Sequence, residues 1–366
     1  MDWNCQQSNY KGDMIAFAEI IILAIPLTIA TRAIILAVAL AADAIIGEPD
    51  ILWRHLPHPV VIFGRMIKTI SASWHSSHIT GYRRRIRGLA AIILLVLIAI
   101  LGGSGLAALA KVIGDMTDIG AWPVIITEAI LVTILLAGRS LDQHVRDVAH
   151  ALNSASRQDD LTAARQAVSM IVGRNPEQLD APAICRASIE TTAENLSDGV
   201  VAPALYYLLL GLPGIIGYKM INTADSMIGY KSARWLAFGW AAARLDDVAN
   251  LLPARITGWL IVIAALLPQP AQAARAFRIM WRDAGLHRSP NAGWPEAAMA
   301  GALNIVLAGP RKYGARMSTD VPLNRKGRIA ASADIFSALN YLWRVTAIII
   351  ISLLAIGFWP YFWPYL

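Results

Sequence analysis

Long apolar stretches, separated by polar and basic segments, define the organisation of this chain. The clear ones cover residues 14–46, 88–112, 122–138 and 341–360, and each is close to or above the ~20 residues that a helix needs to cross a bilayer. A signal peptide is the alternative for the first stretch, because Lys11 precedes it, but the stretch is long and no small-residue cleavage site follows. The pattern therefore predicts four membrane-spanning helices.

Two further apolar segments, residues 199–217 and 256–267, do not fit an ordinary crossing. The first contains Gly211 and Pro213, which disfavour a straight helix, and the second is shorter than a span. Basic residues flank both segments on both sides, which favours short, protein-buried or re-entrant helices. If both segments did cross, the stretch from residue 219 to residue 250 would lie outside the cell.

The distribution of basic residues predicts the orientation. The run from Tyr82 to Arg87 stands directly before the second clear span, and Lys and Arg accumulate on the cytoplasmic side of membrane proteins. Residues 139–340 then form a cytoplasmic-side catalytic region, and the aromatic C-terminal segment reaches the periplasmic interface. The expected fold is an all-α, polytopic membrane helical bundle that forms a single domain over residues 1–366.

Composition supports a membrane protein and excludes several other classes. Hydrophobic residues make up 56% of the chain and charged residues only 16%, whereas a soluble domain has about 25% charged residues. Abundant apolar residues exclude disorder, and two distant cysteines exclude a disulfide scaffold. The net charge of +7 is explained by cytoplasmic loops, so we expect no nucleic-acid partner.

Glu190, Glu194 and Asp198 form the first candidate chemical cluster. They are spaced at i, i+4 and i+8, so on a helix they share one face. Like charges on one face repel unless a cation lies between them, which indicates magnesium or a Lys or Arg from elsewhere. A solvated helix face is the equally weighted alternative.

A second cluster lies between Lys219 and Lys231. Lys219, Asn222 and Ser226 share a helix face at i, i+3 and i+7, with Asp225 beside Asn222. Oxygen ligands suit magnesium and lysine supplies a point charge to phosphate, so this stripe can hold a metal-bound phosphate. A polar seam packed between helices is the alternative.

A third cluster contains Arg244, Asp246, Asp247 and Asn250. Adjacent carboxylates with an amide one turn later are typical of magnesium-binding faces in membrane transferases that handle phosphorylated substrates. An interfacial salt-bridge cluster, pairing Arg244 with Asp247 or Arg255 with Asp246, explains the same residues equally well.

The fourth cluster, residues 287–297, contains Ser289, Asn291 and Glu296. Pro290 and Gly293 in this segment predict a turn, and Pro295 with Glu296 predicts the first turn of a helix that runs to Leu307. Amide groups at such a helix start can receive an anion. Asn291 is equally compatible with a simple turn residue.

Other sequence motifs do not indicate a function. No Walker-type phosphate loop and no serine nucleophile elbow occur, and the histidine pairs lack an evident third metal ligand. The glycine cluster from Gly102 to Gly105 lies inside a predicted span, where it favours close helix packing over nucleotide binding.

Taken in order, these clusters resemble the adenosylcobinamide-phosphate synthase family of cobalamin biosynthesis, an integral membrane family. The resemblance covers roughly residues 33–314, and no single motif decides it. The matching stretches are residues 43–49, 58–64, 171–174, 190–203, 218–230, 238–255, 289–303 and 309–314. The chain departs from the family pattern at Glu48 and Asn175, where Asp is usual, and at Arg288, where Pro is usual.

The resemblance implies ATP-driven amide formation between adenosylcobyric acid and 1-aminopropan-2-ol or its O-phosphate. It implies a multi-pass protein of the bacterial inner membrane with its active site on the cytoplasmic side, and leaves room for partner enzymes of the pathway at the membrane. A carboxylate is a poor acyl donor, so ATP would convert it to an acyl phosphate, with magnesium and basic residues stabilising the transferred phosphoryl group. A general base would then help the amine to attack.

Roles follow for the candidate residues as expectations. The acidic ones supply magnesium ligands and the base, the basic ones neutralise phosphate, and the amides orient substrate atoms. The expected catalytic residues are Glu190, Glu194, Asp198 and Asp225. The expected metal ligands are Glu190, Glu194, Asp225, Asp246 and Asp247. The expected substrate- and phosphate-binding residues are Asn195, Lys219, Asn222, Lys231, Arg244, Asn250, Ser289, Asn291 and Glu296.

Two other functions remain open. A corrinoid transporter would also place charges in membrane helices. A magnesium-dependent membrane phosphotransferase or prenyltransferase would share the paired acidic helices, and a diphosphate product would identify it.

Overall fold

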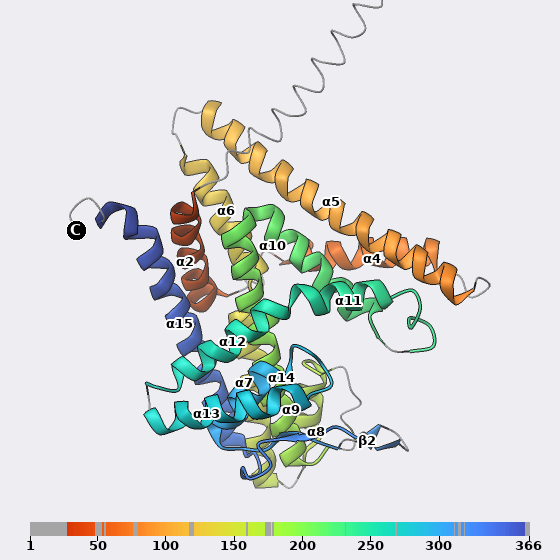
Figure 1. The fold of residues 1–366 in the computed structure, drawn as a ribbon, viewed down its shortest axis with the longest axis vertical. Helices are drawn as coiled ribbons and strands as arrows, with labels where there is room; N and C mark the ends of the chain where they lie inside the picture. Colours follow the sequence, from red (N-terminus) through yellow and green to blue (C-terminus); the bar gives the residue numbers. More distant parts are fainter. Residues whose placement is uncertain are drawn as a thin grey trace, which may run out of the picture.

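The described residues of the chain fold into helices, together with four strands of two residues each (Figure 1). The computed structural model describes residues 28–47, 53–54, 56–75, 80–116, 121–158, 160–172, 177, 179–230, 232–267, 269–310, 312–313, 316–317 and 319–362. The all-helical expectation is therefore confirmed. The first half of the first predicted span, residues 14–27, lies outside the described residues.

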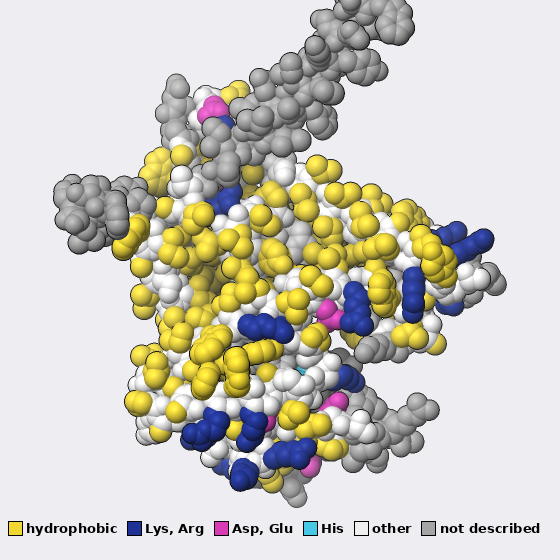
Figure 2. Space-filling model, viewed as in Figure 1, with side chains coloured by type: hydrophobic (Ala, Val, Ile, Leu, Met, Phe, Trp, Pro, Cys, Tyr) yellow, Lys and Arg dark blue, Asp and Glu magenta, His cyan; other side chains and the backbone are white. Residues whose placement is uncertain are grey.

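Five helical stretches of the described chain are long and apolar enough to cross a membrane, and a bent pair of shorter helices raises the number to six. Four stretches contain the described parts of the four predicted spans. They involve α2 (Ile29–Ile46), α5 (Gly81–Met116), α6 (Trp122–Leu135) with α7 (Gly138–Gln158), and α15 (Ser332–Phe362). On the face drawn in Figure 2, hydrophobic side chains cover the region of α5, α10 and α15. Lys and Arg side chains gather at one end of α5 and over the lower part of this view, around α13.

The fifth stretch turns back on itself. It consists of α9 (Ala181–Leu196), the π-helical turn η1 (Ser197–Val201) and α10 (Ala202–Ile228). Gly211 interrupts α10 with φ 66° and ψ −154°, a backbone conformation that is essentially restricted to glycine. Beyond this break the chain returns, because the Tyr218 hydroxyl donates to the Asp198 carbonyl oxygen at 3.1 Å. The expected interrupted, buried segment is thus a helical hairpin, visible as an arch in Figure 1.

Polar contacts inside the apolar region hold the tip of this hairpin. Tyr207 of α10 donates to the Glu128 carboxylate of α6 at 2.5 Å, and both side chains are buried. Arg32 of α2 donates to the Leu209 carbonyl oxygen at 2.9 Å, immediately before Gly211. Ionisable groups within a membrane region are costly unless they are partnered, so these contacts fix the hairpin between α2 and α6. The sequence analysis assigned these residues no role.

Small residues allow the hairpin to pack closely against α5. A Cβ atom added at Gly103 would lie 2.8 Å from the Pro213 Cα atom, so only glycine fits there. This contact confirms the predicted packing role for Gly103, whereas an added Cβ at Gly102 or Gly105 meets no atom within 4 Å. Buried Asp43 of α2 connects the membrane part to α7, because its carboxylate accepts hydrogen bonds from the Gly138 and Arg139 N–H groups at 3.0 and 3.3 Å. These are unpaired donors of a helix start, so Asp43 acts as a cap.

The remaining elements surround the polar end of the hairpin. They are α4 (Pro59–Trp74), α8 (Thr162–Ser169), α11 (Trp240–Ala249), α12 (Leu251–Ala264), α13 (Pro270–Asp283), η2 (Ala284–Leu286) and α14 (Gly293–Leu303). The strands β1 (Leu307–Ala308) and β4 (Pro322–Leu323) pair antiparallel, as do β2 (Lys312–Tyr313) and β3 (Arg316–Met317). Helices α11 and α12 form the bent pair, with an angle of 44° between them.

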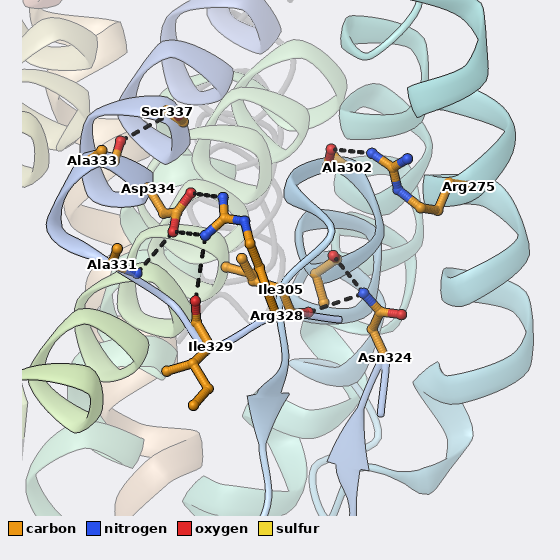
Figure 3. A network of polar contacts seen from close by, with 11 residues as sticks. Arg275, Ala302, Ile305, Asn324, Arg328, Ile329, Ala331, Ala333, Asp334 and Ser337 are labelled. Atoms are coloured by element: carbon orange, nitrogen blue, oxygen red, sulfur yellow. Dashed lines mark hydrogen bonds and ion pairs between the residues drawn. The ribbon is translucent and has the colours of Figure 1, made fainter. Parts of the chain in front are cut away.

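A network of polar contacts fixes the segment between α14 and α15 (Figure 3). Arg328 binds both carboxylate oxygens of Asp334, and the Asn324 side chain donates to the Ala300 and Ile305 carbonyl oxygens at 3.2 and 3.1 Å. Asn304 adopts a left-handed conformation and ends α14 at Leu303. The predicted continuation of this helix to Leu307 is therefore wrong, because residues 307–308 form β1 instead.

Candidate functional site

A polar cavity of about 710 Å³ lies where the ends of the hairpin meet α11, α12 and the turn before α14. All four sequence clusters contribute to its wall. Its acidic side chains come from different elements and are listed by position as Glu194, Asp198, Asp225, Asp246 and Asp247. Asp198 and Asp225 reach the same cavity because α10 turns back at Gly211 between them.

Amide side chains arrange the acidic groups. Asn222 donates to one Asp246 oxygen at 3.3 Å, and Asn250 donates to the other at 3.0 Å. The buried Asn250 in turn accepts a hydrogen bond from the Tyr218 hydroxyl at 2.9 Å. The Asp246 carboxylate is therefore held between α10 and the junction of α11 with α12. Such a hydrogen-bonded polar network restricts the side chains, which suits a site that must hold a defined geometry.

The π-helical turn η1 stands at the centre of the acidic wall. It contains Asp198, and the preceding helix α9 contributes Glu194 and Asn195 to the cavity. Single π turns inside α-helices are rare and occur frequently at functional sites. The Gly199 carbonyl oxygen accepts a hydrogen bond from the Ala137 N–H at 3.1 Å, so this turn is also fixed against the start of α7.

The third cluster forms one of the two salt bridges offered as the alternative to a magnesium-binding face. Arg244 and Asp247 form the expected salt bridge at 3.3 Å, and both line the cavity. Arg255 does not pair with Asp246, because it donates to the Asn291 side-chain oxygen at 2.9 Å. Asn291 then donates to the Asp247 carbonyl oxygen at 2.7 Å. Asn291 is therefore more than a turn residue, since it joins the fourth cluster to the third.

Ser289 and the following turn bring the fourth cluster to the cavity wall. The Ser289 hydroxyl accepts hydrogen bonds from the Asn291 and Ala292 N–H groups, both at 3.2 Å. Arg288, in the same turn, also lines the cavity. The sequence analysis noted Arg288 only as a departure from the family pattern, so its place beside the acidic groups is new.

Three predicted residues do not reach this cavity. Lys219 is buried and close enough to Asp198 for an electrostatic interaction, but it does not line the wall, unlike Asn222, Asp225 and Ser226 of its cluster. Glu190 and Glu296 lie beside a smaller cavity instead. Lys231 lies outside the described residues.

The smaller cavity has a volume of about 160 Å³ and shares Glu194, Arg288, Ser289 and Ala292 with the larger one. Glu190 accepts a hydrogen bond from the Ala308 N–H at 2.6 Å. The three carboxylates predicted to share one face of a helix therefore form a row that leads from the small cavity to the large one.

Aromatic side chains also line the large cavity. Tyr230, Trp235 and Trp240 line it, and Arg85 of α5 lies 5.8 Å above the Trp240 ring. The sequence analysis assigned no role to these three residues, although Trp240 lies within a stretch that carries the family resemblance. Arg85 belongs to the basic run at the start of α5, so the cavity lies on the same side of the molecule as that run.

The carboxylates do not form a complete metal site by themselves. In the part of the chain that the structure describes, no group of three His, Cys, Asp or Glu side chains is arranged to hold a metal ion. The donor set is nevertheless rich in carboxylate and amide oxygens. Magnesium commonly takes only one or two protein carboxylates and fills its other positions with phosphate oxygens and water, and this donor set fits that mode.

Comparison with known proteins connects this geometry to a family. A family model described as CobD/Cbib protein matches residues 36–342. A cobalamin biosynthesis protein CobD from Sinorhizobium sp is 48% identical over 329 residues, which are 89% of this chain and 98% of the relative. Proteins of the same description from Rhizobium meliloti (strain 1021) and Rhodobacter capsulatus are 46% and 44% identical, over 86% and 88% of this chain and 94% and 98% of their own lengths.

No solved structure shows significant similarity to the chain. The family match covers most of the sequence, including every residue that lines the two cavities, and the relatives align over nearly their full lengths. The chain therefore belongs to the CobD/Cbib protein family.

Proposed function

We propose that this protein is an adenosylcobinamide-phosphate synthase, which joins adenosylcobyric acid to 1-aminopropan-2-ol O-phosphate with ATP. The observation that carries the proposal is the convergence of four separate clusters on one cavity rich in carboxylates and amides. Family membership and the curated description of the relatives as cobalamin biosynthesis proteins support the same conclusion.

The proposed reaction has two stages. The substrate carboxylate attacks the γ-phosphorus of ATP, and the bond to the bridging oxygen breaks, which gives an acyl phosphate and ADP. The amine nitrogen then attacks the acyl carbon, the bond to the phosphate oxygen breaks, and inorganic phosphate leaves. Most of the catalysis in such phosphoryl transfers comes from positioning and from charge stabilisation.

Each wall of the large cavity has a part in this proposal. Asp246 and Asp247, together with Asp198 and Asp225, would hold magnesium and the ATP phosphates, and magnesium would neutralise charge on the transferred group. Arg244 and Arg288 supply positive charge to phosphate oxygens. Asn195 and Asn222 are placed to orient substrate amides.

The aromatic wall fits the larger substrates. Tyr230, Trp235 and Trp240 offer flat apolar surfaces to a corrinoid ring or an adenine. The cavity lies beside the basic start of α5, and by the positive-inside rule this supports a location at the cytoplasmic face of a bacterial inner membrane. Both ATP and the intermediates of a biosynthetic pathway are available there.

An assay with the purified protein in detergent tests the proposal. Adenosylcobyric acid, 1-aminopropan-2-ol O-phosphate, ATP and magnesium are supplied, the corrinoid product is followed by mass spectrometry, and ADP is measured. One ADP per amide formed is the expected result. Corrinoid binding without product or ATP use by folded protein would contradict the proposal and favour a transporter, whereas a diphosphate product would favour a transferase.

A further inference from the structure

The small cavity beside α9 differs from the large cavity in size and lining. Its volume of about 160 Å³ corresponds to roughly five water molecules. Cavities that hold drug-sized ligands are about 300 Å³ or larger, so a nucleotide or a corrinoid does not fit inside it. A molecule with only a few non-hydrogen atoms does.

The described side chains around this cavity are mainly acidic, which favours a small molecule with a positive charge. Its carboxylates are Glu190, Glu194, Glu296 and Asp320, and Arg288 is the cationic side chain among the described lining residues. His287 also lines it and lies 3.7 Å from the Glu296 carboxylate, measured between Nε2 and Oε2. Glu190 and Glu296 are 5% and 3% exposed, so their charges act in a poorly solvated region where attraction to a cation is strong.

We propose that the small cavity binds the ammonium end of the amine substrate, next to the larger cavity that holds the nucleotide and the corrinoid carboxylate. This assignment rests on the proposed synthase function and adds the location of one substrate. It gives Glu190 and Glu296 the task of holding a small organic cation, which differs from the metal and phosphate roles expected from sequence.

The passage between the cavities fits the rest of this substrate. Glu194 and Arg288 line both cavities, so they stand at the passage between the bound amine and the acyl phosphate. Arg288 receives the phosphate of the amine substrate. Glu194 takes one proton from the ammonium group, and the neutral nitrogen, no longer held by the charges of Glu190 and Glu296, reaches the acyl carbon through this passage. The new C–N bond forms, the bond from the acyl carbon to the phosphate oxygen breaks, and a second nitrogen proton leaves with inorganic phosphate as HPO₄²⁻.

The experiment compares Glu190→Gln and Glu296→Gln with a matched control, Glu177→Gln. Glutamine keeps the size of each side chain. At position 190 it also keeps an oxygen that can accept the hydrogen bond from the Ala308 N–H. Glu177 is exposed and lines neither cavity. Folding of each variant is checked by thermal unfolding in the same detergent.

Direct binding of 1-aminopropan-2-ol O-phosphate is measured by calorimetry, without turnover. A hydrogen bond to a charged group contributes enough that its loss weakens binding about tenfold or more, so we expect this loss for both cavity variants and none for the control. An equal affinity in all proteins, or no binding by the unchanged protein, would overturn the inference. Because no product is scored, the comparison of the variants with the control locates the amine site separately from the test of amide formation.

Kinetics provide the second measurement. Hydroxylamine can trap an acyl phosphate without occupying the amine site, so adenosylcobyric acid-dependent ADP release with hydroxylamine should be unchanged in both variants. The KM for the amine should rise about tenfold while the KM for ATP stays constant. A raised KM for ATP with an unchanged KM for the amine would assign the cavity to the nucleotide and refute the proposal.

Discussion

Replacing Gly211 by alanine tests the turn that brings Asp198 and Asp225 to the same cavity. The backbone at this residue has φ 66° and ψ −154°, and a side chain in this region costs about 1–3 kcal/mol. An added Cβ would lie 3.3 Å from the terminal nitrogen of Arg32, and this flexible side chain can move aside, so backbone strain dominates. The unfolding equilibrium constant should therefore change by roughly 5- to 150-fold.

Gly105→Ala provides the matched control. Gly105 lies inside α5, and an added Cβ there meets no atom within 4 Å. Alanine is preferred over glycine inside a helix by about 0.5–1 kcal/mol, so this change should be neutral or stabilising. The same substitution in the same chain is thus expected to have opposite effects at the two positions.

Reversible unfolding by SDS in mixed micelles, followed by circular dichroism, measures both variants. Amide formation and ATP use are measured in parallel, because strain at the hairpin tip should also displace Asp198 relative to Asp225. If Gly211→Ala is as stable and as active as Gly105→Ala, the chain does not turn back at this residue, and Asp198 and Asp225 do not reach one cavity through such a turn.

Further predictions concern the carboxylates. Asp246→Asn removes the charge that Asn222 and Asn250 hold in place, and should raise the KM for magnesium–ATP at least about tenfold in a steady-state assay. Excess magnesium should restore the activity of this variant and should have no such effect on the unchanged protein. Glu194→Gln should lower the rate of amide formation by about 10²–10⁴-fold and leave hydroxylamine-dependent ADP release intact, which single-turnover kinetics would show. Burial raises the pKa of Asp283, but hydrogen bonds from Arg282 and the Asn324 N–H, with nearby positive charge, lower it further than burial raises it. A lowered pKa means that the unfolded state binds more protons in acid, so stability should fall as the pH drops through the pKa of the folded state. Asp283→Asn should flatten the acid limb of a plot of stability against pH, and an unchanged limb would contradict this.

Most of the architecture is predictable from hydrophobic length alone, because a helix that crosses a bilayer needs a long apolar run. The hairpin is only partly predictable. Gly211 and Pro213 indicate an interruption, but the direction of the chain after it depends on distant contacts, including Tyr218 with Asp198 and Arg32 with Leu209. Helix periodicity carries no information about such contacts.

The candidate site shows the same division. Spacing places Glu190, Glu194 and Asp198 on one face, and the structure shows that this face divides between two cavities. The division depends on Ala308, whose N–H binds Glu190 across 118 positions of sequence. Lys219 was expected beside Asn222 at the cavity, but one helical turn along α10 is enough to bury it behind the wall.

The hairpin also determines how far this protein can be divided. The described residues that line the large cavity all lie between Ile171 and Pro295, which invites the idea of a water-soluble catalytic fragment. Yet the hairpin that carries Asp198 and Asp225 is fastened by Arg32 of α2 and Glu128 of α6, and Asp43 of α2 caps α7. A fragment without the membrane helices would keep the reactive groups and lose the frame that holds them in register. The candidate membrane helices therefore form part of the frame of the candidate site, and truncation or fusion designs should retain them.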